Sequence, residues 1–251
     1  MRVYATPDNI VGKELRDKTV VVVDVLRTGS TILTALCHGC KEVIPAVETE
    51  AVIRMSKNYE KNSFLLCGER NMQAIEGFHL SNSPLEYTRE QVAGKTLLMT
   101  TTNGTKAICR TNDAREVLIC GLVNVDAVAE YLSGQDSDIV FLCAGTNGQF
   151  SLEDIIAAGA VLNRLCTRLG MQDPEMGDLA VLAASIYDHD KGDLNSLLKG
   201  CTQYRKLAEA GLDRDITYCL TQNAAPVVGV YRDGVIRIPG PAQAQNDENR
   251  E

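Results

Sequence analysis

The sequence predicts an α/β protein, a three-layer arrangement around a largely parallel sheet, with a helix-rich C-terminal half. Three observations indicate this class. Short apolar runs typical of strands alternate with helical patterns over residues 19–143. Runs such as VVVDV and IVFLC are apolar on both faces, as expected of parallel strands covered by helices on either side. The second half of the chain instead contains long helical patterns.

Six strands are expected where β-branched and apolar runs are bounded by turn residues. In chain order they cover residues 19–25, 42–47, 63–67, 96–100, 116–120 and 139–143. Helices are expected at 151–169, 173–187 and 193–210. A hairpin then places VVGVY and VIRIP on either side of Asp233-Gly234, a dipeptide typical of two-residue hairpin loops.

The domain organisation follows from length and composition. We expect a single domain over residues 1–238, or two sub-lobes that share one crevice, and a polar tail over residues 239–251. The formal net charge is −8, and no Lys/Arg cluster is interleaved with aromatic residues, so we expect no nucleic-acid partner.

The expected compartment is the cytoplasm. The longest apolar runs are shorter than the roughly 18 residues that span a bilayer, so no membrane association is expected, and the N-terminus lacks the apolar stretch of a signal peptide. Seven of the nine cysteines are scattered singly, which fits reducing conditions, and Cys37 and Cys40 form a lone C-x-x-C pair that we interpret as structural. An acidic chain of this size is often a homodimer.

Three apolar strands end in small, hydroxylic or glycine-containing turns that enter helices. The segments are VVVDVLRTGST at 21–31, LLMTTTNGT at 97–105 and IVFLCAGTNGQFSLED at 139–154. The carboxyl ends of parallel strands meet at one edge of a sheet, where α/β proteins bind ligands. We therefore expect all three turns to line one crevice.

These turns contain the donors that an anion needs. A helix N-terminus has unpaired N–H groups and a partial positive charge, so it can hold a phosphate without a basic side chain. Ser, Thr and Asn are also the usual N-cap residues, which is the alternative interpretation. The candidate anion-binding residues in these turns and in the segment before Pro84 are Thr28, Ser30, Thr31, Asn82, Ser83, Thr101, Thr102, Asn103, Gly104, Thr105, Gly145, Thr146, Asn147 and Gly148.

Carboxylates and arginines occur at the same strand ends. Asp24 precedes Arg27 by three residues, so this pair could hold a metal ion and clamp an oxyanion, or form a structural salt bridge. Glu69 and Arg70 leave another predicted strand together. The common nucleotide signatures G-x-x-x-x-G-K-[ST] and G-x-G-x-x-G do not occur.

A further pair of acids begins the first long helix of the second half. Ser151, Glu153 and Asp154 match a helix capping box, in which the acids would only complement the helix dipole. The run that follows, IIAAGAVLNRL, is apolar on nearly every face and so is expected to be buried. Acids at the mouth of a buried helix are also well placed to hold a hard cation.

Four segments, in this order and spacing, resemble the 2-phosphosulfolactate phosphatase family. They are VVVDVLRTGSTILTAL, GERNMQAIEGFHLSNSPLEY, GKTLLMTTTNGTKAI and AGTNGQFSLEDIIAAGAV, and the resemblance extends to about Ile238. It implies an α/β phosphatase that uses Mg²⁺ to hydrolyse 2-phospho-3-sulfolactate to 3-sulfolactate and phosphate. In methanogens this step leads to coenzyme M.

The resemblance, read with the residues above, implies roles for the charged side chains. We expect Asp24, Arg27, Glu69 and Arg70 to be catalytic, and Asp24, Glu153 and Asp154 to hold Mg²⁺. The sequence does not distinguish direct attack by water from an aspartyl-phosphate on Asp24. Two alternatives stay open: a phosphatase of the same fold that acts on another small phosphate ester, and a small-anion-binding protein that needs the turns but not the carboxylates.

Overall fold

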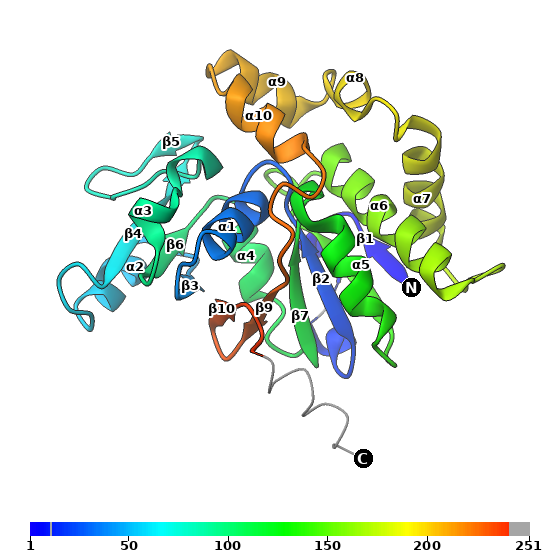
Figure 1. Ribbon diagram of the computed structural model, residues 1–251, viewed down its shortest axis with the longest axis horizontal. Helices are drawn as coiled ribbons and strands as arrows, with labels where there is room; N and C mark the ends of the chain where they lie inside the picture. Colours follow the sequence, from blue (N-terminus) through cyan, green and yellow to red (C-terminus); the bar gives the residue numbers. More distant parts are fainter. Residues whose placement is uncertain (11, 241–251) are drawn as a thin grey trace.

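The computed structural model describes residues 1–10 and 12–240 and confirms the predicted α/β class (Figure 1). The strands are β1 (Arg2–Tyr4), β2 (Thr19–Val23), β3 (Glu42–Pro45), β4 (Phe64–Arg70), β5 (Gln73–Ala74), β6 (Thr96–Thr100), β7 (Glu116–Cys120), β8 (Ile139–Cys143), β9 (Gly229–Arg232) and β10 (Val235–Arg237). The α-helices are α1 (Thr28–Cys37), α2 (Thr49–Ser56), α3 (Arg89–Val92), α4 (Gly104–Cys109), α5 (Val125–Ser133), α6 (Leu152–Leu169), α7 (Asp178–Asp190), α8 (Leu194–Leu198), α9 (Thr202–Glu209) and α10 (Asp213–Leu220). Short 3₁₀ helices are η1 (Pro7–Asn9), η2 (Gly12–Leu15), η3 (Pro84–Glu86) and η4 (Leu122–Asn124).

The strands form one mixed sheet in the order β1-β8-β2-β7-β9-β10-β3-β6-β4-β5. Strands β1, β8, β2 and β7 pair in parallel, and so do β3, β6 and β4. The predicted hairpin is confirmed, and Asp233 and Gly234 at its turn both have positive φ, as a type I′ turn requires. Its position between the two parallel sets, antiparallel to β7 and to β3, was not predicted.

Several element bounds differ from the sequence prediction. Strand β4 continues to Arg70 because Glu69 and Arg70 pair with β5, so both residues belong to the strand rather than to a turn after it. The helix expected at 173–187 begins only at Asp178, after a segment that contains Pro174 and Gly177. The region expected as one helix over 193–210 is divided into α8 and α9.

Alternate residues of β2 enter different cores, which explains why this strand is apolar throughout. Val21 and Val23 belong to the hydrophobic cluster that includes α5 and α6, whereas Val20 and Val22 belong to the cluster that includes α1. Successive side chains of a strand point to opposite faces, so helices on both faces demand apolar residues at every position. The predicted three-layer arrangement is confirmed in this way.

Helices α8, α9 and α10 lie together at one end of the molecule (Figure 1). Helix α10 packs on η3 and η4, so the helix-rich C-terminal half contributes residues near the ends of the strands. Within residues 1–10 and 12–240, no helix combines the length and apolar character needed to cross a bilayer. The single domain, the homodimer and the cytoplasmic location stay predictions, and the predicted tail beyond Gly240 lies outside the described residues.

The contact between α6 and α7 depends on a glycine. A Cβ at Gly159 would lie 2.1 Å from the Ala183 carbonyl oxygen, a distance that forces the helices apart. We predict that Gly159→Ala lowers the free energy of unfolding by about 1–3 kcal/mol, measured by urea denaturation. Gly200→Ala is the control, because its Cβ would meet nothing within 4 Å. Equal stability of the two variants would contradict this packing.

Candidate active site

A cavity of about 220 Å³ lies where the three turns meet, as the sequence predicted. The turns after β2, β6 and β8 contribute to its wall, together with the end of β4 and helix α9. Its lining residues are Asp24, Leu26, Arg27, Thr28, Glu69, Asn71, Met72, Asn82, Thr102, Asn103, Thr146, Asn147, Gln203 and Lys206.

Direct contacts hold the turns after β2, β6 and β8 against one another. A Cβ at Gly104 would lie 2.3 Å from Asp24 Oδ2, so only glycine lets α4 approach Asp24 this closely. The Asn147 backbone N–H donates to Asn103 Oδ1 at 3.0 Å, which connects the turn after β8 to the turn after β6. The mutual distance of the turns is therefore set by close packing and by specific hydrogen bonds.

Asp154 connects the turn after β2 to the turn after β8. One carboxylate oxygen accepts the Val25 backbone N–H at 2.9 Å, and the other accepts the Gly145 N–H at 3.0 Å. Asp154 is only 3% exposed. Both of its oxygens are thus used to position the turns, which is a tertiary role and not the local role of a capping box.

Burial raises the pKa of three neighbouring carboxyl groups. Desolvation, assisted by the charge of Glu69, raises the pKa of Asp24 to about 6, although hydrogen bonds from Thr28 act in the opposite direction. Desolvation and the charge of Asp24 raise the pKa of Glu153 to about 7. The pKa of Asp154 is also well above its usual value, first because of burial and then because of the charges of Asp24 and Glu153. The fully ionised cluster is therefore costly without a compensating cation.

The oxygen atoms near the cavity suit a magnesium ion that keeps water and substrate among its ligands, rather than a metal ion that is fully enclosed by protein ligands. Among the described residues, no three His, Cys, Asp or Glu side chains already converge on one point, so the three predicted ligands do not form a complete site by themselves. Mg²⁺ usually needs only one or two carboxylates, with water and substrate phosphate as its other ligands. None of the residues that the structure describes donates a hydrogen bond to the buried acceptor Asn82 Oδ1, and Asn82 lines the same cavity as Asp24. Asp24 and Asn82 at the cavity wall, with the neighbouring buried Glu153, which does not line the cavity, offer the hard oxygen donors that suit this ion.

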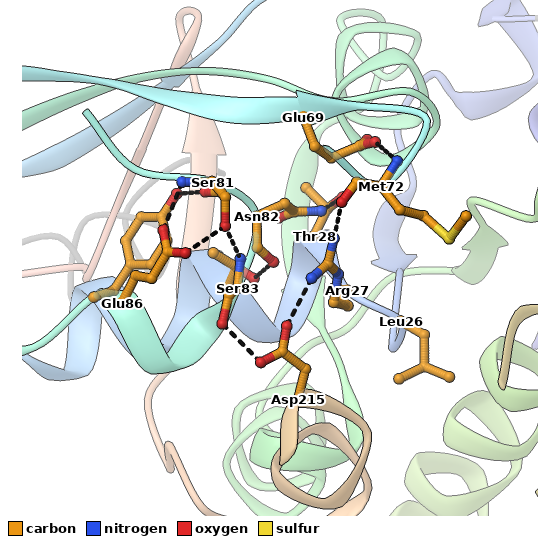
Figure 2. Close-up of polar contacts among 12 residues, drawn as sticks. Leu26, Arg27, Thr28, Glu69, Met72, Ser81, Asn82, Ser83, Glu86 and Asp215 are labelled. Carbon is orange, nitrogen blue, oxygen red and sulfur yellow. Dashed lines mark hydrogen bonds and ion pairs between the residues drawn. The ribbon is translucent and has the colours of Figure 1, made fainter. Parts of the chain in front are cut away.

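Arg27 is held by an ion pair with the C-terminal half of the chain. Figure 2 shows its guanidinium between the Met72 carbonyl and Asp215 of α10. Arg27 Nη1 donates to Asp215 Oδ2 at 2.6 Å, and both side chains are buried. Ser83 Oγ donates to the other Asp215 oxygen at 2.7 Å. The sequence offered Asp24 as the salt-bridge partner of Arg27, but the ion pair that holds Arg27 is formed with Asp215. Arg27 also lines the cavity.

The side chains of Glu69 and Arg70, the last two residues of β4, make different contacts. Glu69 accepts the backbone N–H groups of Thr102 at 2.7 Å and Met72 at 2.8 Å, and it lines the cavity. Arg70 donates to the carbonyl oxygens of Glu69 and Val47, each at 2.9 Å. Arg70 does not line the cavity, and its hydrogen bonds instead connect the ends of neighbouring strands. The sequence had predicted a catalytic role for this residue.

Many of the predicted anion-binding groups instead stabilise backbone. Ser30 Oγ donates to the Val25 carbonyl at 2.8 Å, and Thr31 Oγ1 donates to the Asn82 carbonyl at 3.0 Å. Residues that do line the cavity are Thr28, Asn82, Thr102, Asn103, Thr146 and Asn147. Residues that do not line it are Ser30, Thr31, Ser83, Thr101, Gly104, Thr105, Gly145 and Gly148.

The sequence prediction missed several residues of the cavity wall and one residue behind it. The missed lining residues are Leu26, Asn71, Met72, Gln203 and Lys206, and Asp215 lies behind Arg27. Gln203 and Lys206 are three positions apart on α9, so they share one helix face. That spacing is the only sequence signal available, and it does not indicate what the face contacts.

The raised pKa of Asp24 predicts how stability depends on pH. The folded state favours the neutral acid, so the associated stability is complete below the unfolded pKa near 4 and is lost as pH rises through about 6. Asp24→Asn should therefore raise the free energy of unfolding by about 1–3 kcal/mol at pH 8 and change it little at pH 4. Urea denaturation at both pH values measures this difference.

The matched control is Asp188→Asn. Asp188 is exposed, and its pKa is lowered by a hydrogen bond from Lys191, so this variant should show no gain of stability at pH 8. A loss of stability at pH 8 in Asp24→Asn would contradict the assignment of Asp24 as a costly buried charge.

Comparison with known proteins identifies the family. The family model described as 2-phosphosulpholactate phosphatase matches residues 4–234. A protein of Caldanaerobacter subterraneus subsp. tengcongensis named "Probable 2-phosphosulfolactate phosphatase" is 44% identical over 94% of this chain and 97% of its own length. Proteins with the same name from Clostridium acetobutylicum and Clostridium beijerinckii are 41% and 38% identical, over 91% and 93% of this chain and 96% and 97% of their own lengths. The chain therefore belongs to the 2-phosphosulfolactate phosphatase family, and such a phosphatase is a phosphoric monoester hydrolase.

Proposed function

We propose that this protein hydrolyses 2-phospho-3-sulfolactate to 3-sulfolactate and inorganic phosphate with the help of Mg²⁺. The observation that carries the proposal is the convergence of three strand-end turns and the buried Asp24 carboxylate on one small cavity, in a chain of this family. The names of the relatives support the substrate, because curated proteins up to 44% identical are named for this activity.

The chemistry of the substrate fits the lining of the cavity. Phosphate, carboxylate and sulfonate groups need many donors. Asn103 and Asn147 bring side-chain amides to the cavity wall, whereas the Thr28 and Thr102 hydroxyls donate to Thr101 Oγ1 and Glu69 Oε2. These groups are fixed by packing before a ligand arrives, so they need little reorganisation when charge develops on the phosphoryl group. The small volume, about 220 Å³, favours a small phosphate ester.

Asp24, Glu153 and Asn82 would hold the Mg²⁺ ion. Their oxygens are the hard donors that Mg²⁺ prefers, and two of the three residues are acids whose ionised form is disfavoured by burial. When bound, the ion neutralises phosphate charge and lowers the pKa of water. Asp154 keeps the turns around this set in place through its two backbone hydrogen bonds.

The proposed reaction is an in-line displacement at phosphorus. The oxygen of a water molecule forms a bond to phosphorus while the bond from phosphorus to the C2 oxygen breaks. One water proton ends on the C2 oxygen, which becomes the hydroxyl of 3-sulfolactate, and the water oxygen stays with inorganic phosphate. Arg27, fixed by Asp215, has further N–H groups available to orient the phosphoryl oxygens. An acid-quenched enzyme that carries phosphate on Asp24 would reject this direct attack in favour of a covalent route.

The first functional test is release of inorganic phosphate from 2-phospho-3-sulfolactate, phospholactate and sugar phosphates, with Mg²⁺ and with excess chelator. We predict that release is fastest from the sulfonated ester and is abolished by the chelator, because the buried carboxylates need a cation to accept a phosphate. Release only from other esters would keep the reaction and reject the substrate. Tight anion binding without release would make the protein a binding protein.

A second test separates the two roles of Arg27. A variant that combines Arg27→Met with Asp215→Asn removes both buried charges, and the new amide can still accept the Ser83 hydroxyl. We predict that its melting temperature stays above that of Arg27→Met alone, because the single variant leaves Asp215 buried and unpaired. Its kcat/KM should nevertheless fall about 100-fold or more. Turnover at the wild-type level would show that the ion pair is only structural.

A further inference from the structure

Helix α9 presents one of its faces to the cavity. Gln203 and Lys206 line the cavity, whereas Leu207, the next residue, is fully buried in the hydrophobic core. Gln203 Nε2 donates to the Leu26 carbonyl at 3.4 Å, next to Arg27 in the chain. The orientation of α9 is therefore fixed by core packing on one side and by the turn after β2 on the other.

Lys206 is a cation of the cavity lining that has no partner in the described part of the chain. The charged residues of the lining are Asp24, Arg27, Glu69 and Lys206. Arg27 is paired with Asp215 at 2.6 Å. Within residues 1–10 and 12–240, the side chain of the half-buried residue Lys206 has neither an ion pair nor a hydrogen bond. Because Lys206 lines the cavity, its ammonium is available to pair with an anionic group bound there.

Arg70 does not fill the same role. The sequence predicted a catalytic role for Arg70, but its guanidinium donates to the Glu69 and Val47 carbonyls and to the Thr100 hydroxyl. After the phosphoryl group is placed at the strand-end turns with Arg27, a second anionic group still needs a cation. Lys206, on a separate element, is the available one.

We infer that Lys206 binds the second anionic group of the substrate, the carboxylate or sulfonate on the carbon skeleton that carries the phosphate. Lys206 thereby selects phosphate esters that carry such a group over esters that do not. The inference rests on the proposed function, and it adds the residue that determines specificity. A lysine ammonium is a compact point charge, so it can pair with either anion without the planar fit that an arginine fork requires.

The test compares Lys206→Gln with wild type on 2-phospho-3-sulfolactate, phospholactate and isopropyl phosphate, which lacks both additional anions. We expect kcat/KM to fall about 10- to 100-fold for the substrates that carry the recognised anion, mainly through KM, and to stay unchanged for isopropyl phosphate. Lys206→Arg should restore part of the loss. Arg205→Gln is the control, because it removes one positive charge from an exposed position of the same helix.

The substrate series also identifies the recognised group. A loss confined to the sulfonated ester assigns the sulfonate to Lys206, and an equal loss with phospholactate assigns the carboxylate. An equal loss on all three esters, or no loss on any, would overturn the inference.

A binding measurement keeps the inference separate from the proposed function. Calorimetry with 3-sulfolactate, which carries both additional anions but no phosphate, should give at least about 10-fold weaker binding to Lys206→Gln than to wild type or Arg205→Gln. Absence of turnover by the wild type would reject the proposed function alone. Equal affinity of all three proteins for 3-sulfolactate would reject the role of Lys206 alone.

Discussion

The close approach of three strand-end turns is the constraint on which the rest of the site depends. Asp154 accepts backbone N–H groups from the turns after β2 and β8, and Gly104 lets the turn after β6 reach the Asp24 carboxylate. Neither contact tolerates an ordinary replacement, because a Cβ at position 104 would overlap Asp24 and a neutral side chain at position 154 would not accept both bonds. The cavity exists because these contacts hold its wall in place.

The close approach of the three turns also brings several carboxylates together in a place that is shielded from water. Asp24, Glu153 and Asp154 are each buried, and desolvation raises the pKa of all three. Such a cluster costs folding free energy at neutral pH, and clusters of this kind occur where function requires them. The buried pair of Arg27 and Asp215 adds a second ionic element, which joins the C-terminal helices to the turn after β2. The site therefore costs folding free energy, and buried ionic contacts hold its wall in place.

The sequence was sufficient for eight of the ten described strands, all but β1 and β5, and for the three turns, but insufficient for long-range partners. Apolar runs such as β2 predict buried parallel strands, because every position faces a helix layer. The hairpin was predicted from Asp233-Gly234, but its insertion between β7 and β3 depends on strand pairing that no local pattern encodes. In the same way Arg27 pairs with a residue 188 positions away, and only the fold brings them together.

Residue type sets a second limit on what the sequence predicts about the candidate site. Ser and Thr serve equally well as ligands and as partners for nearby backbone, so Ser30 and Thr31 could not be separated from Thr28 by residue type. The position of Arg70 outside the cavity lining could not be predicted for a similar reason, since carbonyl oxygens satisfy a guanidinium as well as an oxyanion does. Lys206 was missed because a lysine on an amphipathic helix normally faces solvent.

The most direct test of the proposed cation site is calorimetric titration of Mg²⁺ into the wild-type protein and into Asp24→Asn at pH 8. The carboxylate of Asp24 is ionised at that pH, well above its pKa of about 6, so the wild type should bind the ion. The variant keeps the size of the side chain but loses its charge, and its affinity should fall by at least about 10-fold. Equal affinity of both proteins, or no binding to either, would contradict the assignment of this buried carboxylate cluster as the place where the cation is held.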